Sequence, residues 1–344
     1  MLPPFGWQAV LQQWQFAPVV TVLAAALAAL YLWGVWRVGQ RHPARPWRWW
    51  RTAFFLAGLA VIVLATESGI GAYDDVLFWD HMVQHLMLIM VAPPLLVAGQ
   101  PVTLLLHASR NPLHTWTKRV IRSRVVTFLT WPPFTLAAYA AVIVSTHLTG
   151  LITATITHPV LHDAEHAVYL VVGYLFFLPI VGSEPIRWRL SYPIRFLLLA
   201  VAMPVDTFTG LILSMQGTPL RATNGPAPPG SPNPLQDIHW AGAIMWVAGD
   251  ALMFGFMMLV FLMWARSDQG GDSSLGWLEK VRSNSFEHTT GRVATPATGQ
   301  VASPATSPAA ASAHGTIDDD EHLAAYNDYL ARLNQSGHGP AGRQ

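Results

Sequence analysis

Long runs of apolar residues, separated by short polar connections, occupy the first three quarters of the chain. The hydrocarbon core of a bilayer accommodates about 20 apolar residues of helix. Seven runs reach this length, and they predict transmembrane helices over residues 17–38, 49–69, 78–106, 124–147, 160–182, 192–215 and 238–265. The pattern therefore predicts an all-α integral membrane protein, a bundle of seven transmembrane helices formed by residues 1–266.

Prolines interrupt three of these predicted spans. Pro93-Pro94 divides the third span, Pro132-Pro133 lies in the fourth, and Pro204 lies in the sixth. Proline has no N–H group and leaves a carbonyl of the preceding turn without its helical donor. Neighbouring helices or polar side chains must then satisfy that carbonyl, so we expect kinks at these positions.

The composition changes after Arg266. Residues 268–317 are rich in Gly, Ser, Ala, Thr and Pro, which is typical of a disordered segment. Within residues 318–334, leucine and tyrosine recur at helical spacing behind an acidic run that suits a helix N-terminus. We therefore expect residues 267–344 to form a flexible, disordered C-terminal tail with one short helix near 318–334.

Basic residues in the short connections predict the orientation in the membrane. Thirteen Lys and Arg residues lie in the first, third and fifth connections, whereas the other side of the membrane has only Arg221. Because cytoplasmic loops carry the excess of Lys and Arg, the N-terminus is expected outside the cytoplasm and the tail inside. The first sixteen residues lack a basic start, so no cleavable signal peptide is expected. The predicted location is a bacterial plasma membrane, crossed several times.

Composition supports the membrane assignment and excludes several chemistries. Only 11% of the residues are charged and 52% are hydrophobic, whereas about a quarter of a soluble domain is charged. The net charge of +1 makes nucleic acid an unsuitable partner. The chain has no cysteine, which excludes disulfides, thiolate nucleophiles, iron–sulfur clusters and cysteine-type zinc sites. A bound metal would have to use His, Met or carboxylate ligands.

Histidines gather at the predicted extracytoplasmic ends of four helices. They are His81, His85, His147, His158, His162, His166 and His239. Residues four apart lie on one helical face, so His81/His85 and His162/His166 each form a pair. On adjacent helices the two pairs would present up to four imidazoles to one ion. Imidazole suits copper and zinc, and affinity for divalent ions peaks at copper.

Methionine and carboxylate side chains add to this picture. Thioethers suit Cu(I), and Met215 is the best placed of them, at the outer end of the sixth span. The predicted metal ligands are therefore His81, His85, His162, His166, His147, His239 and Met215, with Cu(I) the favoured ion. Asp206 and Asp250 lie inside the sixth and seventh spans, where a carboxylate is costly and serves either function or helix packing.

Three segments resemble a known family. They are "DHMVQHLMLIMVAPPLLVAGQPVTLLLHA", "HPVLHDAEH" and "IMWVAGDAL". They are similar to the polytopic CtaG family of cytochrome c oxidase assembly proteins, the multi-span type of Bacillus and actinobacteria. The similarity covers about residues 20–266. It implies an integral membrane factor that is needed to build active oxidase and that helps deliver copper to the oxidase copper centre.

The resemblance also implies individual site residues. His81 and His85 match the family's pair in the third span, His162 and His166 match the pair in the fifth, and His147 matches a histidine ending the fourth. At the start of the seventh span the family pattern is rich in glutamine. Here the sequence is "DIH", and His239 stands in place of a glutamine. The implied partners are oxidase subunits or other assembly factors, together with the lipid bilayer.

Two other functions are consistent with the same residues. One is a membrane redox protein that holds a b-type haem between histidines of two helices. The other is a copper or proton-coupled transporter with Asp206 and Asp250 as a relay. Both histidine pairs lie on one side of the membrane, which favours the copper-binding assembly factor. The sequence shows no nucleophile–base pair and no phosphate-binding loop, so no enzymatic activity is expected.

Overall fold

A computed structural model of the chain describes residues 8, 12–44, 46–151, 154–155, 158–182, 184–218 and 229–269. All regular elements in these residues are helices. Six helical segments are long and apolar enough to cross a membrane: Pro18–Arg41, Trp49–Tyr73, Phe78–Ala108, Pro159–Val181, Tyr192–Ser214 and Pro234–Ser267. The all-helical, multi-pass membrane architecture is confirmed. The last helix extends to Gln269, so the first three residues of the predicted flexible tail, 267–269, are helical. The rest of that tail, including the short helix near 318–334, and Arg221 lie outside the described residues.

The first two long helices are connected by a short basic turn. They are α2 (Pro18–Arg41) and α3 (Trp49–Glu67), and they pack against each other. The five-residue helix α4 (Gly69–Tyr73) follows, and the hydroxyl of Ser68 caps it by accepting a hydrogen bond from Ile70 N–H. This short helix connects α3 to the start of the third span.

The third span consists of four consecutive helical pieces. They are α5 (Phe78–Leu86), the π-helix η1 (Met87–Val91), α6 (Ala92–Ala98) and α7 (Pro101–Ala108). The change to π-helix immediately precedes Pro93 and Pro94, which cannot donate hydrogen bonds to the turn before them. The interruption predicted at this proline pair is therefore present.

The region predicted as the fourth span is divided. After α8 (Leu113–Ile121), the chain forms α9 (Arg124–Leu129) and then α10 (Pro132–Leu148). The division falls at Trp131, because the prolines that follow suit the first turn of a new helix but not the interior of an old one. At 1.5 Å per residue, the 17 residues of α10 rise about 26 Å, somewhat less than a bilayer core of about 30 Å. The count of seven spans remains a prediction.

The last three long helices agree with the predicted spans to within a few residues. They are α12 (Pro159–Val181), α13 (Tyr192–Ser214) and α14 (Pro234–Gln269). Helices α13 and α14 approach each other closely at Gly210 and Gly242, where an added Cβ on either glycine would lie within 2.7 Å of the other's carbonyl oxygen. Small residues of this kind let membrane helices bring their backbones together.

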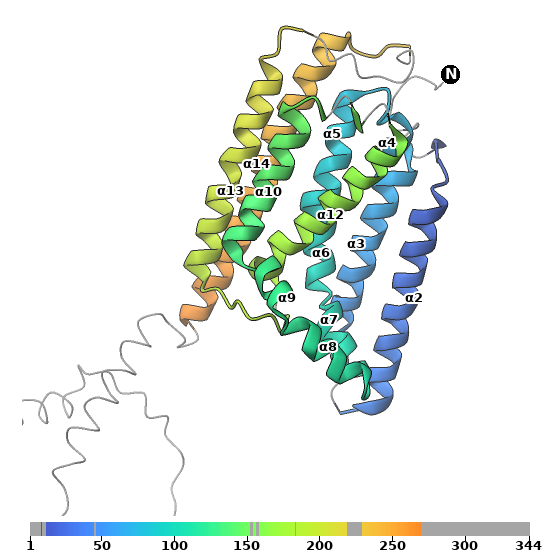
Figure 1. Cartoon of the computed structure of the whole chain (residues 1–344), viewed down its shortest axis with the longest axis vertical. Helices are drawn as coiled ribbons and strands as arrows, with labels where there is room; N and C mark the ends of the chain where they lie inside the picture. Colours follow the sequence, from blue (N-terminus) through green and yellow to red (C-terminus); the bar gives the residue numbers. More distant parts are fainter. Residues whose placement is uncertain are drawn as a thin grey trace, which may run out of the picture. The chain divides into compact units, whose positions relative to one another are not determined.

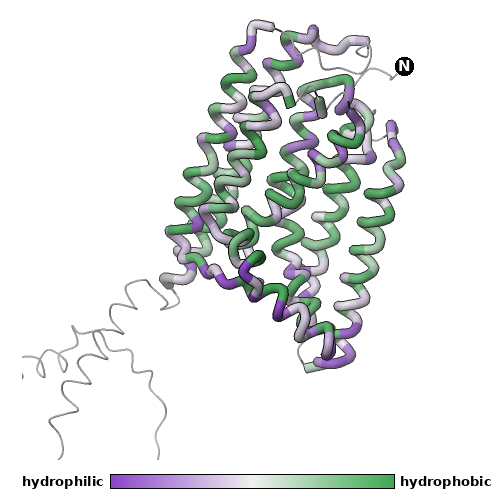
Figure 2. Tube along the Cα trace, in the orientation of Figure 1, coloured by the Kyte–Doolittle hydropathy of each residue, from purple (hydrophilic) through white to green (hydrophobic). Residues whose placement is uncertain are grey.

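The long helices run side by side in the unit formed by residues 1–262 (Figure 1). Helix α12 packs against η1, α6 and α10, and α10 also packs against α13. Figure 2 shows apolar residues along the helices and hydrophilic residues gathered toward their ends. Helices α4 and α5 lie at one end of this bundle, and α7 and α8 lie at the other (Figure 1). Polar side chains on α4, α5 and α12 are thus brought to one end.

Candidate metal centre

A carboxylate from a distant part of the chain fixes the beginning of α5. The Asp237 side chain accepts hydrogen bonds from the N–H groups of Phe78 and Trp79, both at 2.9 Å. The first turn of a helix has N–H groups without helical partners, and a carboxylate there satisfies them and complements the helix dipole. Asp237 therefore holds the helical turn that leads directly to His81.

The first cluster of side chains that could hold a metal ion, called the inner group, consists of His81, His85 and Glu165. The two histidines are one helical turn apart on α5, with ring centroids 4.1 Å apart. Glu165 comes from α12, and its Oε2 lies 4.0 Å from His81 Nε2 and 3.7 Å from His85 Nε2. One ligand atom of each residue lies within 4.8 Å of the others, and all three side chains are buried.

Within the part of the chain that the structure describes, the ring nitrogens of the inner group have no hydrogen-bond partner. Both nitrogens of His81 and both of His85 are buried without one. A buried polar group left unsatisfied costs roughly 1–3 kcal/mol, so four of them in one place require a compensating partner. With bonds of about 2.0 Å, two ligands of a tetrahedral ion lie roughly 3.3 Å apart. The observed separations exceed that by less than 1 Å, so the donor set fits a metal ion.

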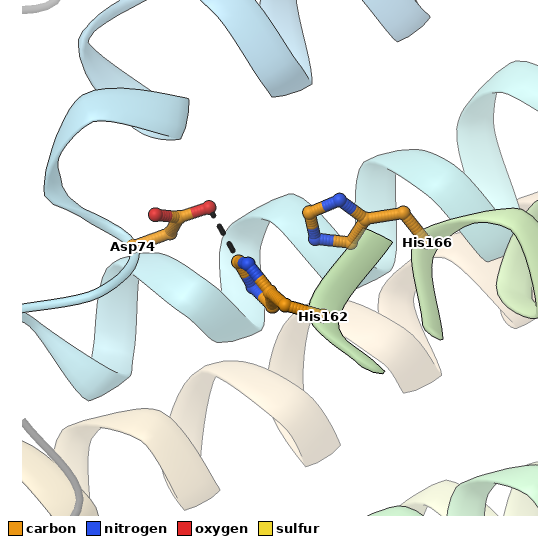
Figure 3. Close-up of side chains that lie close together, drawn as sticks. All are labelled: Asp74, His162 and His166. Carbon is orange, nitrogen blue, oxygen red and sulfur yellow. Dashed lines mark ion pairs between the residues drawn. The ribbon is translucent and has the colours of Figure 1, made fainter. Parts of the chain in front are cut away.

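A second cluster, called the outer group, consists of Asp74, His162 and His166 (Figure 3). Asp74 follows α4, and the two histidines are one turn apart on α12 with ring centroids 4.3 Å apart. His162 Nε2 lies 3.8 Å from Asp74 Oδ2, and His162 Nδ1 lies 3.9 Å from Asp75 Oδ1. Asp74 is buried, but both histidines are only partly buried, unlike those of the inner group.

Gln84 connects Asp74 and His166 of the outer group through hydrogen bonds. Its Nε2 donates hydrogen bonds to the Ala65 carbonyl at 2.9 Å and to Asp74 Oδ2 at 2.7 Å. Both partners are acceptors, so the amide oxygen faces the other way, 2.8 Å from His166 Nε2. An amide oxygen can only accept, and His166 must therefore carry its proton on Nε2. The lone pair of the His166 ring then lies on Nδ1.

Burial also changes the acidity of the outer carboxyl group. Removal from water raises the pKa of Asp74 well above its usual value, and the neighbouring Asp75 raises it further. The hydrogen bond from Gln84 opposes this shift without cancelling it. A cation beside Asp74 would favour the ionised form, because an opposite charge at close range lowers a carboxyl pKa.

The two groups adjoin each other through their imidazole rings. The rings of His81 and His162 are nearly parallel with centroids 5.2 Å apart, and those of His85 and His166 are 6.3 Å apart. The structure thus brings together the four histidines of the two predicted pairs. It arranges them as two neighbouring groups, each with one carboxylate, rather than as four imidazoles around one point.

His147 lies close to the inner group but has partners of its own. Its Nδ1 lies 2.9 Å from the Ile143 carbonyl, and its Nε2 lies 3.2 Å from Met82 Sδ. Its ring centroid is 5.5 Å from that of His85. These two rings and three of the sequence's methionines line one small cavity below the inner group; the methionines are Met82, Met90 and Met245. Thioether donors are therefore present beside the histidines.

Met215 and His239 belong to neither group. Met215 follows α13 with 83% of its surface exposed, and His239 Nε2 lies 2.9 Å from the Gln216 carbonyl. The deeper acids also have protein partners. Asp206 accepts a hydrogen bond from the Tyr139 hydroxyl at 2.9 Å, and Asp250 accepts one from the Thr207 hydroxyl at 2.8 Å. Each of these two acids therefore accepts at least one hydrogen bond from a neighbouring helix.

Sequence reasoning did not identify Glu165, Asp74 or Gln84 as parts of the site. For Glu165 a signal existed, because it lies three residues after His162 and next to His166, near the face that carries the pair. For Asp74 and Gln84 no local signal existed. Their roles depend on how α4 and α5 fold back toward α12, which spacing along one helix does not reveal.

Comparison with known proteins identifies the relatives of the chain. The family model described as cytochrome c oxidase caa3 assembly factor matches residues 29–267. An uncharacterised protein of Mycobacterium tuberculosis is 31% identical over 269 residues, and one of Mycobacterium leprae is 29% identical over 264. These matches cover 76% and 74% of this chain, which spans only about 40% of the length of either relative. No solved structure matches the chain.

Proposed function

Because this chain belongs to the cytochrome c oxidase caa3 assembly factor family, we propose that it binds copper at one end of its helix bundle and helps deliver it to the oxidase. The observation that supports this proposal best is the inner group. Two buried imidazoles and a buried carboxylate converge there, and the four ring nitrogens have no hydrogen-bond partner within the described residues.

The choice of copper follows from the ligand chemistry. Imidazole binds copper strongly, and the thioethers of Met82, Met90 and Met245 line the cavity directly below. The sequence contains no cysteine, so thiolate ligands do not compete. Cu(I) carries a single charge that the Glu165 carboxylate can balance, which matters because a buried charge must be paired. Cu(I) is therefore the favoured form of the cargo.

Delivery of an ion makes demands on the site that differ from those of an enzyme. The chain has to bind copper, keep it from water and release it by exchange of ligands. Neutral imidazoles and a carboxylate do this without making or breaking a covalent bond in a substrate. We infer a non-catalytic role, with oxidase subunits or other assembly factors as acceptors and the copper end of the bundle outside the cytoplasm.

The test is a measurement of copper in the purified full chain, loaded with Cu(I) under reducing conditions. His81→Ala/His85→Ala should remove the ion of the inner group. His107→Ala/His114→Ala is the matched control, because those rings lie toward the other end of the bundle and contact the carbonyls of Thr103 and Leu106. Normal copper content in the first variant, or an equal loss in the control, would overturn the proposal.

A cellular measurement separates copper delivery from other assembly functions. Cells with the His81→Ala/His85→Ala variant should contain oxidase protein of low activity, and added copper should partly restore that activity. Failure of added copper to help, with the oxidase polypeptides absent, would instead indicate a role in stabilising the oxidase subunits.

A further inference from the structure

We infer that Asp74, His162 and His166 form a second copper position, separate from the inner group, so that one chain holds two ions at once. This inference rests on the proposed function, because it assigns the same ion to the outer group. Each group has its own pair of imidazoles from one helix and its own carboxylate, and in each group one ligand atom per residue lies within 4.8 Å of the others.

The carboxylates divide the six side chains into two sets. Glu165 lies against the Nε2 atoms of His81 and His85, at 4.0 and 3.7 Å, whereas Asp74 lies 3.8 Å from His162 Nε2. Two Cu(I) ions bring two positive charges, and one carboxylate in each group balances one of them. With a single Cu(I) shared by all six, one of the two buried carboxyl groups would have no cation beside it and would stay neutral instead of holding an ion.

The outer group is prepared for a ligand by its hydrogen bonds. Gln84 donates a hydrogen bond to the Asp74 carboxylate and accepts one from His166 Nε2–H, which leaves the other nitrogen of that ring with its lone pair. His162 Nε2 is buried without a hydrogen-bond partner among the described residues and points toward Asp74 (Figure 3). The unpaired nitrogen and the fixed carboxylate therefore face the same position.

Burial gives the two positions different access to water. His81 and His85 are 0% and 3% exposed, whereas His162 and His166 are partly exposed, and Asp75 beside them is half-exposed. The ring of His162 lies against that of His81, with centroids 5.2 Å apart. An ion that enters or leaves the inner group therefore passes the outer group, and the outer position is the one that exchanges copper with a partner.

The stoichiometry of Cu(I) bound to the purified full chain tests this inference. The wild-type chain should bind two ions, and His81→Ala/His85→Ala and His162→Ala/His166→Ala should each bind one. Asp74→Asn should also bind one, while still accepting the hydrogen bond from Gln84 through its amide oxygen. Asp163→Asn, an exposed change next to His162, is the matched control and should bind two.

The outcomes distinguish this inference from the proposed function. If the wild type binds one ion and both double variants lose it, the two groups form a single shared site. If the wild type binds one ion and only His81→Ala/His85→Ala loses it, the inner group alone binds copper. Either result overturns the second position and leaves the proposed function intact. Full copper content in His81→Ala/His85→Ala overturns the proposed function itself.

The route through the outer group has its own test. The rate at which the inner ion is released to a soluble Cu(I) chelator should change in Asp74→Asn, and an unchanged rate would contradict this route.

Discussion

Gln84 is the side chain on which the protonation state of the outer group depends. Its amide donates to Ala65 and Asp74 and accepts from His166, so all its bonds are used in one orientation. Residues that orient metal ligands in this way typically change metal affinity by roughly 10–100-fold when they are removed. The hydrogen bond that Gln84 accepts determines which nitrogen of His166 carries the proton and which carries the lone pair.

Gln84→Ala should therefore weaken copper at the outer group by about tenfold or more, while the inner ion stays bound. Competition with a Cu(I) chelator of known affinity measures this in the purified chain. Gln236→Ala, at an exposed position near the start of α14, is the matched control. Equal affinities for Gln84→Ala and wild type would show that the hydrogen bonds of Gln84 do not prepare the outer group.

Glu184 predicts a pH dependence of stability. It accepts hydrogen bonds from the N–H groups of Val102 and Thr103 at the start of α7, yet burial raises its pKa above the usual value. An acid with a raised folded pKa contributes stability that is complete below its unfolded pKa and is lost as the pH rises through the folded pKa. Wild type should therefore lose stability relative to Glu184→Gln over the pH range above about 4.5, the ordinary pKa of a glutamate. Thermal unfolding in detergent measures the difference, and a constant difference across this range would contradict the raised pKa.

Spacing along the sequence carried much of the information about the histidines of the two groups. The pairs His81/His85 and His162/His166 were predictable because residues four apart share a helical face, and the structure places both pairs at one end of the bundle. Glu165 had a signal in its position next to His166, but Asp74 did not, because a position near a helix end does not say which helix it faces. Met215 has the right chemistry and position along its span, but 83% of its surface is exposed and it belongs to neither group.

At the level of helices, the distance between the third span and α12 decides whether the two groups can form. The inner group takes ligands from both elements, and they meet again two turns further along, where Gly173 packs against η1. A Cβ added to Gly173 would lie 2.3 Å from the Ile89 carbonyl oxygen and 2.8 Å from the Pro93 ring. Pro93 cannot donate to that carbonyl, so the π-helix leaves it facing α12.

Gly173→Ala should therefore push α12 away from η1 and lower both copper binding and thermal stability. The clash involves backbone and a proline ring, which cannot rotate away as a flexible side chain can. Gly255→Ala in α14 is the control, because its added Cβ meets nothing within 4 Å. Copper titration and thermal unfolding of the two variants measure the effect, and normal binding in Gly173→Ala would show that the helices adjust without affecting the groups.

Prolines explain where the predicted spans agree with the helices and where they do not. The apolar run of residues 124–147 was predicted as one span, but the structure starts a new helix at Pro132, in keeping with proline's preference for a first turn. Pro204 remains inside α13, and Pro179 remains inside α12. Hydropathy alone does not distinguish a proline that starts a helix from one that kinks it, because this depends on the helices packed around it.

For the whole molecule, the decisive question is which side of the membrane holds the two groups. The basic residues of the first, third and fifth connections predict that the opposite end of the bundle faces outward. Of these residues, Arg41 donates a hydrogen bond to the Ala108 carbonyl at the end of α7, and α7 lies at the other end of the bundle from α4 and α5 (Figure 1). Copper delivery to an oxidase from outside the cytoplasm requires the predicted orientation.

The absence of cysteine from the sequence allows a direct test of this orientation. Two exposed threonines flank helices α9 and α10 in the sequence. They are Thr115 in α8 and Thr149 directly after α10. A membrane-impermeant maleimide should label Thr149→Cys in intact cells and Thr115→Cys only after permeabilisation, while the wild-type chain stays unlabelled. The reverse pattern would place both groups in the cytoplasm and contradict delivery from outside.

The same two variants test the number of spans. Equal labelling of both in intact cells would show that α9 and α10 do not cross the membrane, which would remove the fourth of the seven predicted spans. Because α10 alone rises only about 26 Å, this pair of variants tests the number of spans together with the direction in which copper leaves.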